Sequence, residues 1–125
     1  MRRMFEAFNR DDSDAVVAAF VEDCQLYEPP EMPDRPPLGF RGHEGIREWM
    51  HKLRGVADVR FEPDGFTVGG DVIVTKLTAR GRGQASGVPI HWRTFAVLHM
   101  RESKIARAEG FLTRAEALEA GGLQE

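Results

Sequence analysis

The stretch GHEGIREWMHKL, residues 42–53, carries two histidines and a glutamate, the residue types that hold and use a catalytic zinc ion. A zinc-binding helix of that kind needs its two histidines one turn apart on one face. Here the position one turn after His43 is Arg47, and His51 lies about two turns away. Four apolar residues of the stretch have the spacing of a helix packed against a core: Ile46, Trp49, Met50 and Leu53. We therefore predict a structural helix over 43–54 and no metal site.

The composition of the whole chain limits what such residues can belong to. At 125 residues the chain is long enough for one core and too short for two, so we predict a single domain over 1–125. A net charge of −3 argues against a general nucleic-acid-binding protein, and no apolar run has the length of a membrane span or the form of a signal peptide. The single cysteine, Cys24, excludes an internal disulfide and fits a cytoplasmic protein, in which we expect it to be a packing thiol.

The elements that must position any functional group change in kind along the chain. Helical spacing marks residues 2–9 and 14–21, and a short strand, CQLYEPP, follows at 24–30. The segment 29–40 holds five of the seven prolines, which predicts an irregular loop before the 43–54 helix. Four strand-like runs separated by turn signals and a capped last helix complete the chain: 58–68, 71–83, 88–100, 104–112 and 113–123. Helices followed by a meander of antiparallel strands predict an α+β fold, one curved sheet with helices packed on one face.

The turns between the last three strand runs determine which side chains share a face. If QASG at 84–87 and RESK at 101–104 close the two hairpins, strand alternation collects one mostly apolar set on one face. That set includes Ile73, Thr75, Leu77, Ala79, Trp92, Thr94, Ala96, Leu98, Glu109 and Phe111. We expect this face to meet the helices, and the opposite face, with Phe95 and Val97 among basic residues, to meet solvent or a second subunit. On the apolar face Glu109 must be paired with an arginine, hydrated, or functional.

The order of the elements and several of their sequences resemble the NTF2-like superfamily, and in detail its SnoaL-like branch. The matching segments span about residues 4–123: FNRDDSDAVVAAFVEDC, FRGHEGIREWM, the SG turn at 86–87, SKIARAEGF and TRAEALEAGGL. The resemblance implies a cone with three N-terminal helices on the concave face of the sheet, a deep apolar pocket between helices and sheet, and a homodimer. Members of the superfamily include ketosteroid isomerases, polyketide cyclases, epoxide hydrolases and proteins that only bind, so the fold does not fix the function.

In the ketosteroid isomerases of this superfamily, a general-base aspartate stands just before a proline at the end of the first strand. The match without a gap puts Glu28, before Pro29, at that position, where a carboxylate can move a proton beside a carbonyl group. The partners of that base are missing, because the tyrosine of the first helix falls at Met4 and the assisting aspartate falls near Thr94 or Phe95. The resemblance thus implies a base at Glu28 without the rest of a steroid-isomerase site.

Two other reactions of the superfamily make different demands on the sequence. The epoxide hydrolases carry a catalytic aspartate at the position of Glu109, and Tyr27 could help to hold water, but their charged relay would fall within 75–79, where Lys76 is the charged residue. A polyketide cyclase needs an apolar pocket for a flat substrate and one acid/base group, which is either Glu28 or Glu109. Aromatic side chains are available to line such a pocket: Trp49, Trp92, Phe5, Phe20 and Phe111.

Two function classes remain. In the first, the protein is a cofactor-independent acid/base enzyme of isomerase or cyclase type that acts on a small apolar metabolite. In the second, it is a dimeric ligand-binding or accessory protein without chemistry. For the enzyme we expect Glu28, Tyr27 and Glu109 as the polar groups of the pocket. The alternative for Glu28 is a surface position in the loop, paired with Arg35 or Arg41. Titrating carboxylates in the pocket favour an enzyme, and a pocket filled by side chains favours the second class.

Overall fold

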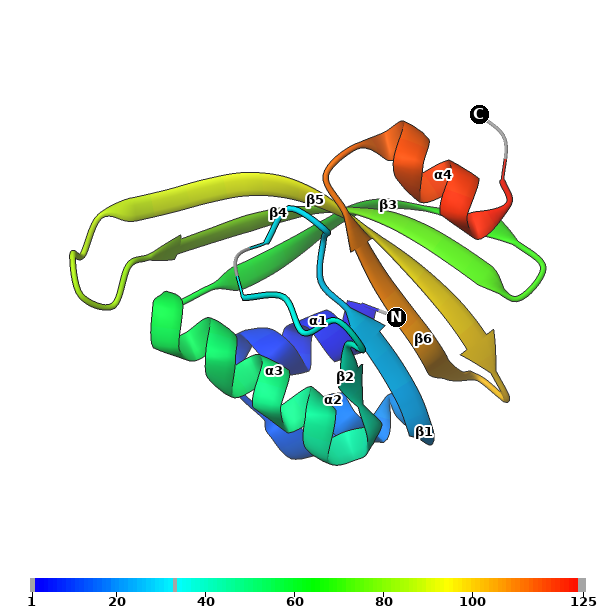
Figure 1. Ribbon diagram of the computed structural model, residues 1–125, viewed down its shortest axis with the longest axis horizontal. Coiled ribbons are helices and arrows are strands. Elements are labelled where there is room, and N and C mark those ends of the chain that lie inside the picture. The colour runs from blue at the N-terminus through cyan, green and yellow to red at the C-terminus, as the bar shows by residue number, and fades with distance from the viewer. Residues whose placement is uncertain (1, 33, 124–125) are drawn as a thin grey trace.

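The computed structural model describes residues 2–32 and 34–123, and it has the predicted α+β architecture. Six strands form one curved sheet in the order β2-β1-β6-β5-β4-β3. The first three helices lie on one side of the sheet and the last helix lies on the other (Figure 1). The elements in chain order are α1 (Arg2–Asn9), α2 (Ser13–Ala18), β1 (Phe20–Tyr27), β2 (Phe40–Arg41), α3 (Gly42–Val56), β3 (Arg60–Gly69), β4 (Val72–Arg82), β5 (Pro89–Arg101), β6 (Lys104–Phe111) and α4 (Arg114–Gly121). No helix in the described residues has the length and apolar character needed to cross a membrane.

The sequence predicts an antiparallel sheet, and all but one of the strand pairs are antiparallel. The exception is β1, which runs parallel to β6, so that the first and the last strand of the chain are neighbours. β1 also begins earlier than the sequence predicts: α2 ends at Ala18, and Phe20 already belongs to the strand. The apolar residues around this boundary fit the spacing of a helix as well as that of a buried strand, so the spacing alone does not locate the change.

The main core lies on the inner face of the sheet, which we define as the face toward α1, α2 and α3. The apolar stripe predicted for α3 is confirmed, because three of its four residues are buried and Trp49 packs against the same core. Phe8 of α1 is 1% exposed, and its ring centroid lies 5.3 Å from that of Trp49 and 5.0 Å from that of Phe61 on β3. These ring contacts join α1, α3 and the sheet.

The hairpin between β4 and β5 has the predicted register. Leu77 lies opposite Thr94, and Ala79 lies opposite Trp92. Leu77 and Ala79 are buried in the inner-face core, and Trp92 packs against it. The prediction that Trp92 points toward the helices is therefore confirmed.

The hairpin between β5 and β6 has the predicted turn but not the predicted register. Ile105 pairs as expected, whereas His99 lies opposite Arg107, which leaves one extra residue in β6 as a β-bulge. Because side chains alternate along a strand, the bulge moves every later side chain of β6 to the opposite face. Glu109 and Phe111 therefore lie on the outer face of the sheet, and their predicted place toward the helices is wrong.

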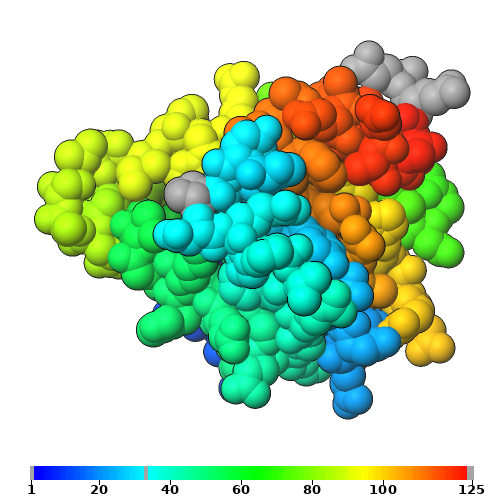
Figure 2. All heavy atoms as spheres, in the orientation of Figure 1, coloured from blue at the N-terminus to red at the C-terminus, as the bar shows by residue number. Residues whose placement is uncertain are grey.

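α4 covers part of this outer face (Figure 1 and Figure 2). Its Ala117 and Leu118 are buried against Val74 and Val97, and Phe111 packs against the same cluster. From the sequence we expect Val97 to face solvent or a second subunit. Instead, α4 of the same chain covers Val97, which is 0% exposed.

A homodimer stays a prediction, and it must use the part of the outer face that α4 leaves open. We expect sedimentation velocity at micromolar concentration to show a species of twice the 14.0 kDa chain mass. Dilution should shift it toward the monomer by mass action. A single 14.0 kDa species at the highest concentration would contradict the prediction.

Candidate active site

Glu28 directly follows β1, along which alternate side chains point to opposite faces. Cys24 and Leu26 are buried on the inner face, and burial raises the pKa of the Cys24 thiol, as suits a packing residue. Glu28 continues this side of the strand, and its side chain is only 2% exposed. Pro29 packs against β6, where a Cβ added to Gly110 would lie 2.8 Å from the Pro29 Cδ. The alternative of a surface position for Glu28 is thus wrong.

The charge of Glu28 is balanced by Lys52 of α3. Lys52 Nζ lies 2.6 Å from Glu28 Oε1 and also donates to the backbone oxygen of Asp34, at 3.3 Å. Arg35, considered from the sequence as an ion-pair partner, instead donates from Nε to the backbone oxygen of Glu28, at 2.8 Å. The proline-rich loop therefore holds both members of the buried pair through its backbone and Arg35.

The second carboxylate oxygen of Glu28, Oε2, is buried and has no hydrogen-bond partner among the residues that the structure describes. A buried acceptor without a donor costs on the order of 1–3 kcal/mol, and most such groups in proteins are satisfied. An unsatisfied carboxylate oxygen on the inner face can accept a hydrogen bond or a proton from a molecule placed beside it. This atom is the most chemically distinctive feature of the inner face.

The aromatic residues predicted to line a pocket are divided between the two faces. Phe5 and Phe20 are buried in the inner-face core, and Trp49 and Trp92 pack against it, whereas Phe111 lies under α4. The inner rings pack on their neighbours rather than around a described cavity, as the contact of Trp49 with Phe8 shows. The deep apolar pocket therefore stays a prediction.

One surface pocket touches the buried pair from outside. It has a volume of about 330 Å³ and lies on α3. The residues that line it are Glu44, Arg47, Glu48, His51 and Lys52. Lys52 thus lines a pocket open to solvent while its ammonium group contacts the buried Glu28 carboxylate.

Tyr27 and Glu109 are brought together, but on the outer face. They are register partners of β1 and β6, and the Arg107 guanidinium lies 4.8 Å from the centre of the Tyr27 ring. Glu109 pairs with Arg107 at 3.3 Å and contacts the His99 ring nitrogen at 3.1 Å. Of the three polar groups predicted for the pocket, only Glu28 faces the helices. Tyr27 is excluded because adjacent residues of a strand point to opposite faces, and Glu109 because of the bulge in β6.

Lys52 is not among the site residues that the sequence predicts. Its position near the end of the 43–54 helix is explained by the helix dipole alone, which favours cations there. The contact with Glu28 joins residues 24 positions apart through the packing of α3 on β1, and no local pattern of the sequence indicates it.

Comparison with known protein families gives a match to this chain. A family model described as SnoaL-like domain matches residues 1–108. None of the curated proteins matches the chain.

Several solved structures share the fold. An NTF2-like protein from Burkholderia pseudomallei is 22% identical, with a TM-score of 0.76 over 94% of this chain and 91% of that chain. TerC, co-crystallised with polyporic acid, is also 22% identical, with a TM-score of 0.79 over 94% of this chain and 92% of that chain. A proposed polyketide cyclase from Sinorhizobium meliloti is 24% identical, with a TM-score of 0.68 over 86% of this chain and 89% of that chain. At these identities the likeness concerns the fold.

Proposed function

This chain belongs to the SnoaL-like domain family, and we propose that it binds a small, largely apolar molecule beside Glu28 and moves a proton with the Glu28 carboxylate. The observation that carries the proposal is the buried Oε2 of Glu28, which has no hydrogen-bond partner among the described residues. Similar structures that were co-crystallised with polyporic acid or named as a proposed polyketide cyclase support a flat cyclic compound as the ligand.

The two oxygens of Glu28 have different tasks in this proposal. Oε1 is held by Lys52, which fixes the orientation of the carboxylate. Oε2 accepts a proton from a carbon or a hydroxyl group of the substrate and returns it to another atom of the same molecule. No net oxidation or reduction takes place, so no redox partner is required. A positioned base of this kind accelerates proton transfer by about 10²–10⁴-fold.

A binding protein without chemistry is the second candidate. The observation in its favour is that the inner face is packed with aromatic side chains, among them Phe8 and Trp49 in direct contact. In that case the ion pair of Glu28 and Lys52 is a structural link between β1 and α3.

The test compares the wild type with Glu28→Gln, which keeps the shape of the side chain and removes the base. Hydrogen–deuterium exchange at carbon in D₂O, followed by NMR, is measured on a panel of cyclic β-diketones and hydroxyquinones that carry an acidic C–H group. We expect the wild type to accelerate exchange of at least one compound, and Glu28→Gln to lower that rate by about 100-fold or more. Glu31→Gln, which alters an exposed carboxylate nearby, should leave the rate unchanged.

Binding of the same compounds, and of polyporic acid, is measured in parallel by quenching of tryptophan fluorescence. Binding without exchange in either protein would select the second candidate. Neither binding nor exchange across the panel would contradict the proposal, and equal exchange rates in wild type and Glu28→Gln would remove the role of Glu28.

A further inference from the structure

The outer face of the sheet places basic side chains directly opposite one another on three strands. Arg60 of β3 lies opposite Arg80 of β4, and Arg80 lies opposite His91 of β5. Two more arginines are the diagonal neighbours of this row, Arg82 on β4 and Arg93 on β5. All five side chains are exposed, in a chain whose net charge is −3.

Like charges directly opposite one another destabilise a sheet, whereas opposite charges stabilise it. The described structure offers this row little compensation. The carboxylate of Glu62 lies 3.8 Å from Arg80, but both side chains are more than half exposed, so this pair contributes little. A concentration of like charge that the fold itself does not need is typical of a functional surface.

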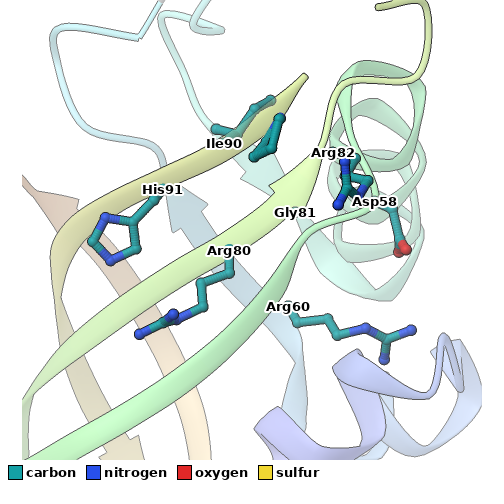
Figure 3. A pocket seen from close by; sticks show the side chains of 8 residues that line it. Asp58, Arg60, Arg80, Gly81, Arg82, Ile90 and His91 are labelled. Carbon is teal, nitrogen blue, oxygen red and sulfur yellow. The ribbon is translucent and has the colours of Figure 1, made fainter. Parts of the chain in front are cut away.

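A groove runs beside this row (Figure 3). It has a volume of about 420 Å³, within the range of small-molecule sites. Its lining residues include Arg60, Arg80, Arg82 and His91, together with the exposed Pro89. Gly81 lets β4 approach the segment before β3 closely, because a Cβ there would lie 2.0 Å from the backbone oxygen of Asp58.

The arginines of the groove keep donors free for a ligand. Arg82 uses Nη1 on the backbone oxygen of Gly87, at 3.2 Å, and Arg60 uses Nη1 on the backbone oxygen of Asn9, at 2.6 Å. A guanidinium group has five N–H donors in a planar fork that matches the oxygens of a phosphate or a carboxylate. One acidic side chain, Asp58, lies at the groove, and its carboxylate is 3.9 Å from Arg54, outside the row.

We propose that this groove binds a small molecule that carries a phosphate or carboxylate group, with Arg80 and Arg82 as the principal contacts. The site lies on the opposite face of the sheet from Glu28 and is independent of the proposed chemistry there. A homodimer that uses this face must leave the groove at this end of β4 open. The apolar ring of Pro89 would contact the uncharged part of the ligand.

The test uses thermal unfolding of the wild type and of the variant Arg80→Gln/Arg82→Gln, with pyrophosphate and citrate as probes. Each probe is compared with NaCl at the same ionic strength. A ligand present at 100 times its dissociation constant should raise the Tm of the wild type by roughly 5 °C or more, and NaCl should not. The double variant should lose this shift, and Arg3→Gln, which alters an exposed arginine of α1, should keep it.

The two probes distinguish the kinds of ligand, because a shift with pyrophosphate alone assigns a phosphate group and a shift with citrate alone assigns a carboxylate. Two-dimensional ¹H–¹⁵N NMR of the wild type locates the binding without any variant, and the largest changes should fall at 58–60, 80–82 and 89–91. An equal Tm shift in NaCl, an unchanged shift in the double variant, or NMR changes spread over the molecule would each overturn the proposal.

Discussion

Replacing Lys52 by methionine should destabilise the protein by about 3–5 kcal/mol, the range measured when one partner of a buried ion pair is removed. The cause is the Glu28 carboxylate, whose side chain is 2% exposed and whose only ion-pair contact in the described structure is Lys52, at 2.6 Å. Methionine keeps most of the apolar stem of lysine, so the loss reports the charge rather than the packing. Urea denaturation followed by circular dichroism measures the change in the free energy of unfolding.

Two further variants separate the charge from other causes. The double variant Glu28→Gln/Lys52→Met removes both charges, and it should recover a large part of the stability lost in Lys52→Met. Lys104→Met, at an exposed position of β6, should change stability by less than about 0.5 kcal/mol. Equal effects of Lys52→Met and Lys104→Met would show that Glu28 is not buried with a charge in solution.

Replacing Phe8 by alanine should cost about 3–5 kcal/mol, because it removes a ring that is 1% exposed and leaves a cavity. The ring contacts Trp49 of α3 and Phe61 of β3, so the loss falls on the contacts that hold α1 and α3 on the sheet. Thermal and urea unfolding measure the effect.

The control for Phe8→Ala is Leu38→Ala, since Leu38 is 70% exposed and its truncation should stay within about 0.5 kcal/mol. A further consequence is specific to a cavity. Apolar cavities of this kind bind small aromatic molecules, so benzene or indole should restore part of the stability of Phe8→Ala and none of that of Leu38→Ala. A loss below about 1 kcal/mol for Phe8→Ala would mean that α1 is not packed as the structure has it.

The sequence predicts correctly what short-range geometry determines. The register of Ala79 with Trp92 follows from the QASG turn and the two-residue alternation of the strands, and it is confirmed. The last hairpin shows the limit of this reasoning. Its turn is right, but one extra residue between Ile105 and Arg107 reverses the face of Glu109. A bulge at an ordinary alanine has no local signature, because it lacks the glycine that marks one common type of bulge.

The candidate site shows the same division. The resemblance predicts a pocket carboxylate at Glu28, and the burial of Glu28 agrees with that. Its partner Lys52 was not predicted, because an ion pair between a strand end and a helix depends on how the two elements pack. Tyr27 directly precedes Glu28, so its side chain points to the opposite face of the sheet, and its predicted place in the pocket is wrong.

The parallel pairing of β1 with β6 also determines when the chain can fold during its synthesis. β1 ends at residue 27 and its neighbour β6 ends at residue 111, and the backbone of Ile105 donates to the oxygen of Ala19, at 2.9 Å, where the two strands meet. Until β6 has left the ribosome, β1 can pair only with the two residues of β2. Phe20 of β1, which lies opposite Ile105 of β6, therefore has no strand partner while almost the whole chain is made. Pairings so distant in sequence form slowly, and exposed apolar segments of this kind are what chaperones bind on nascent chains.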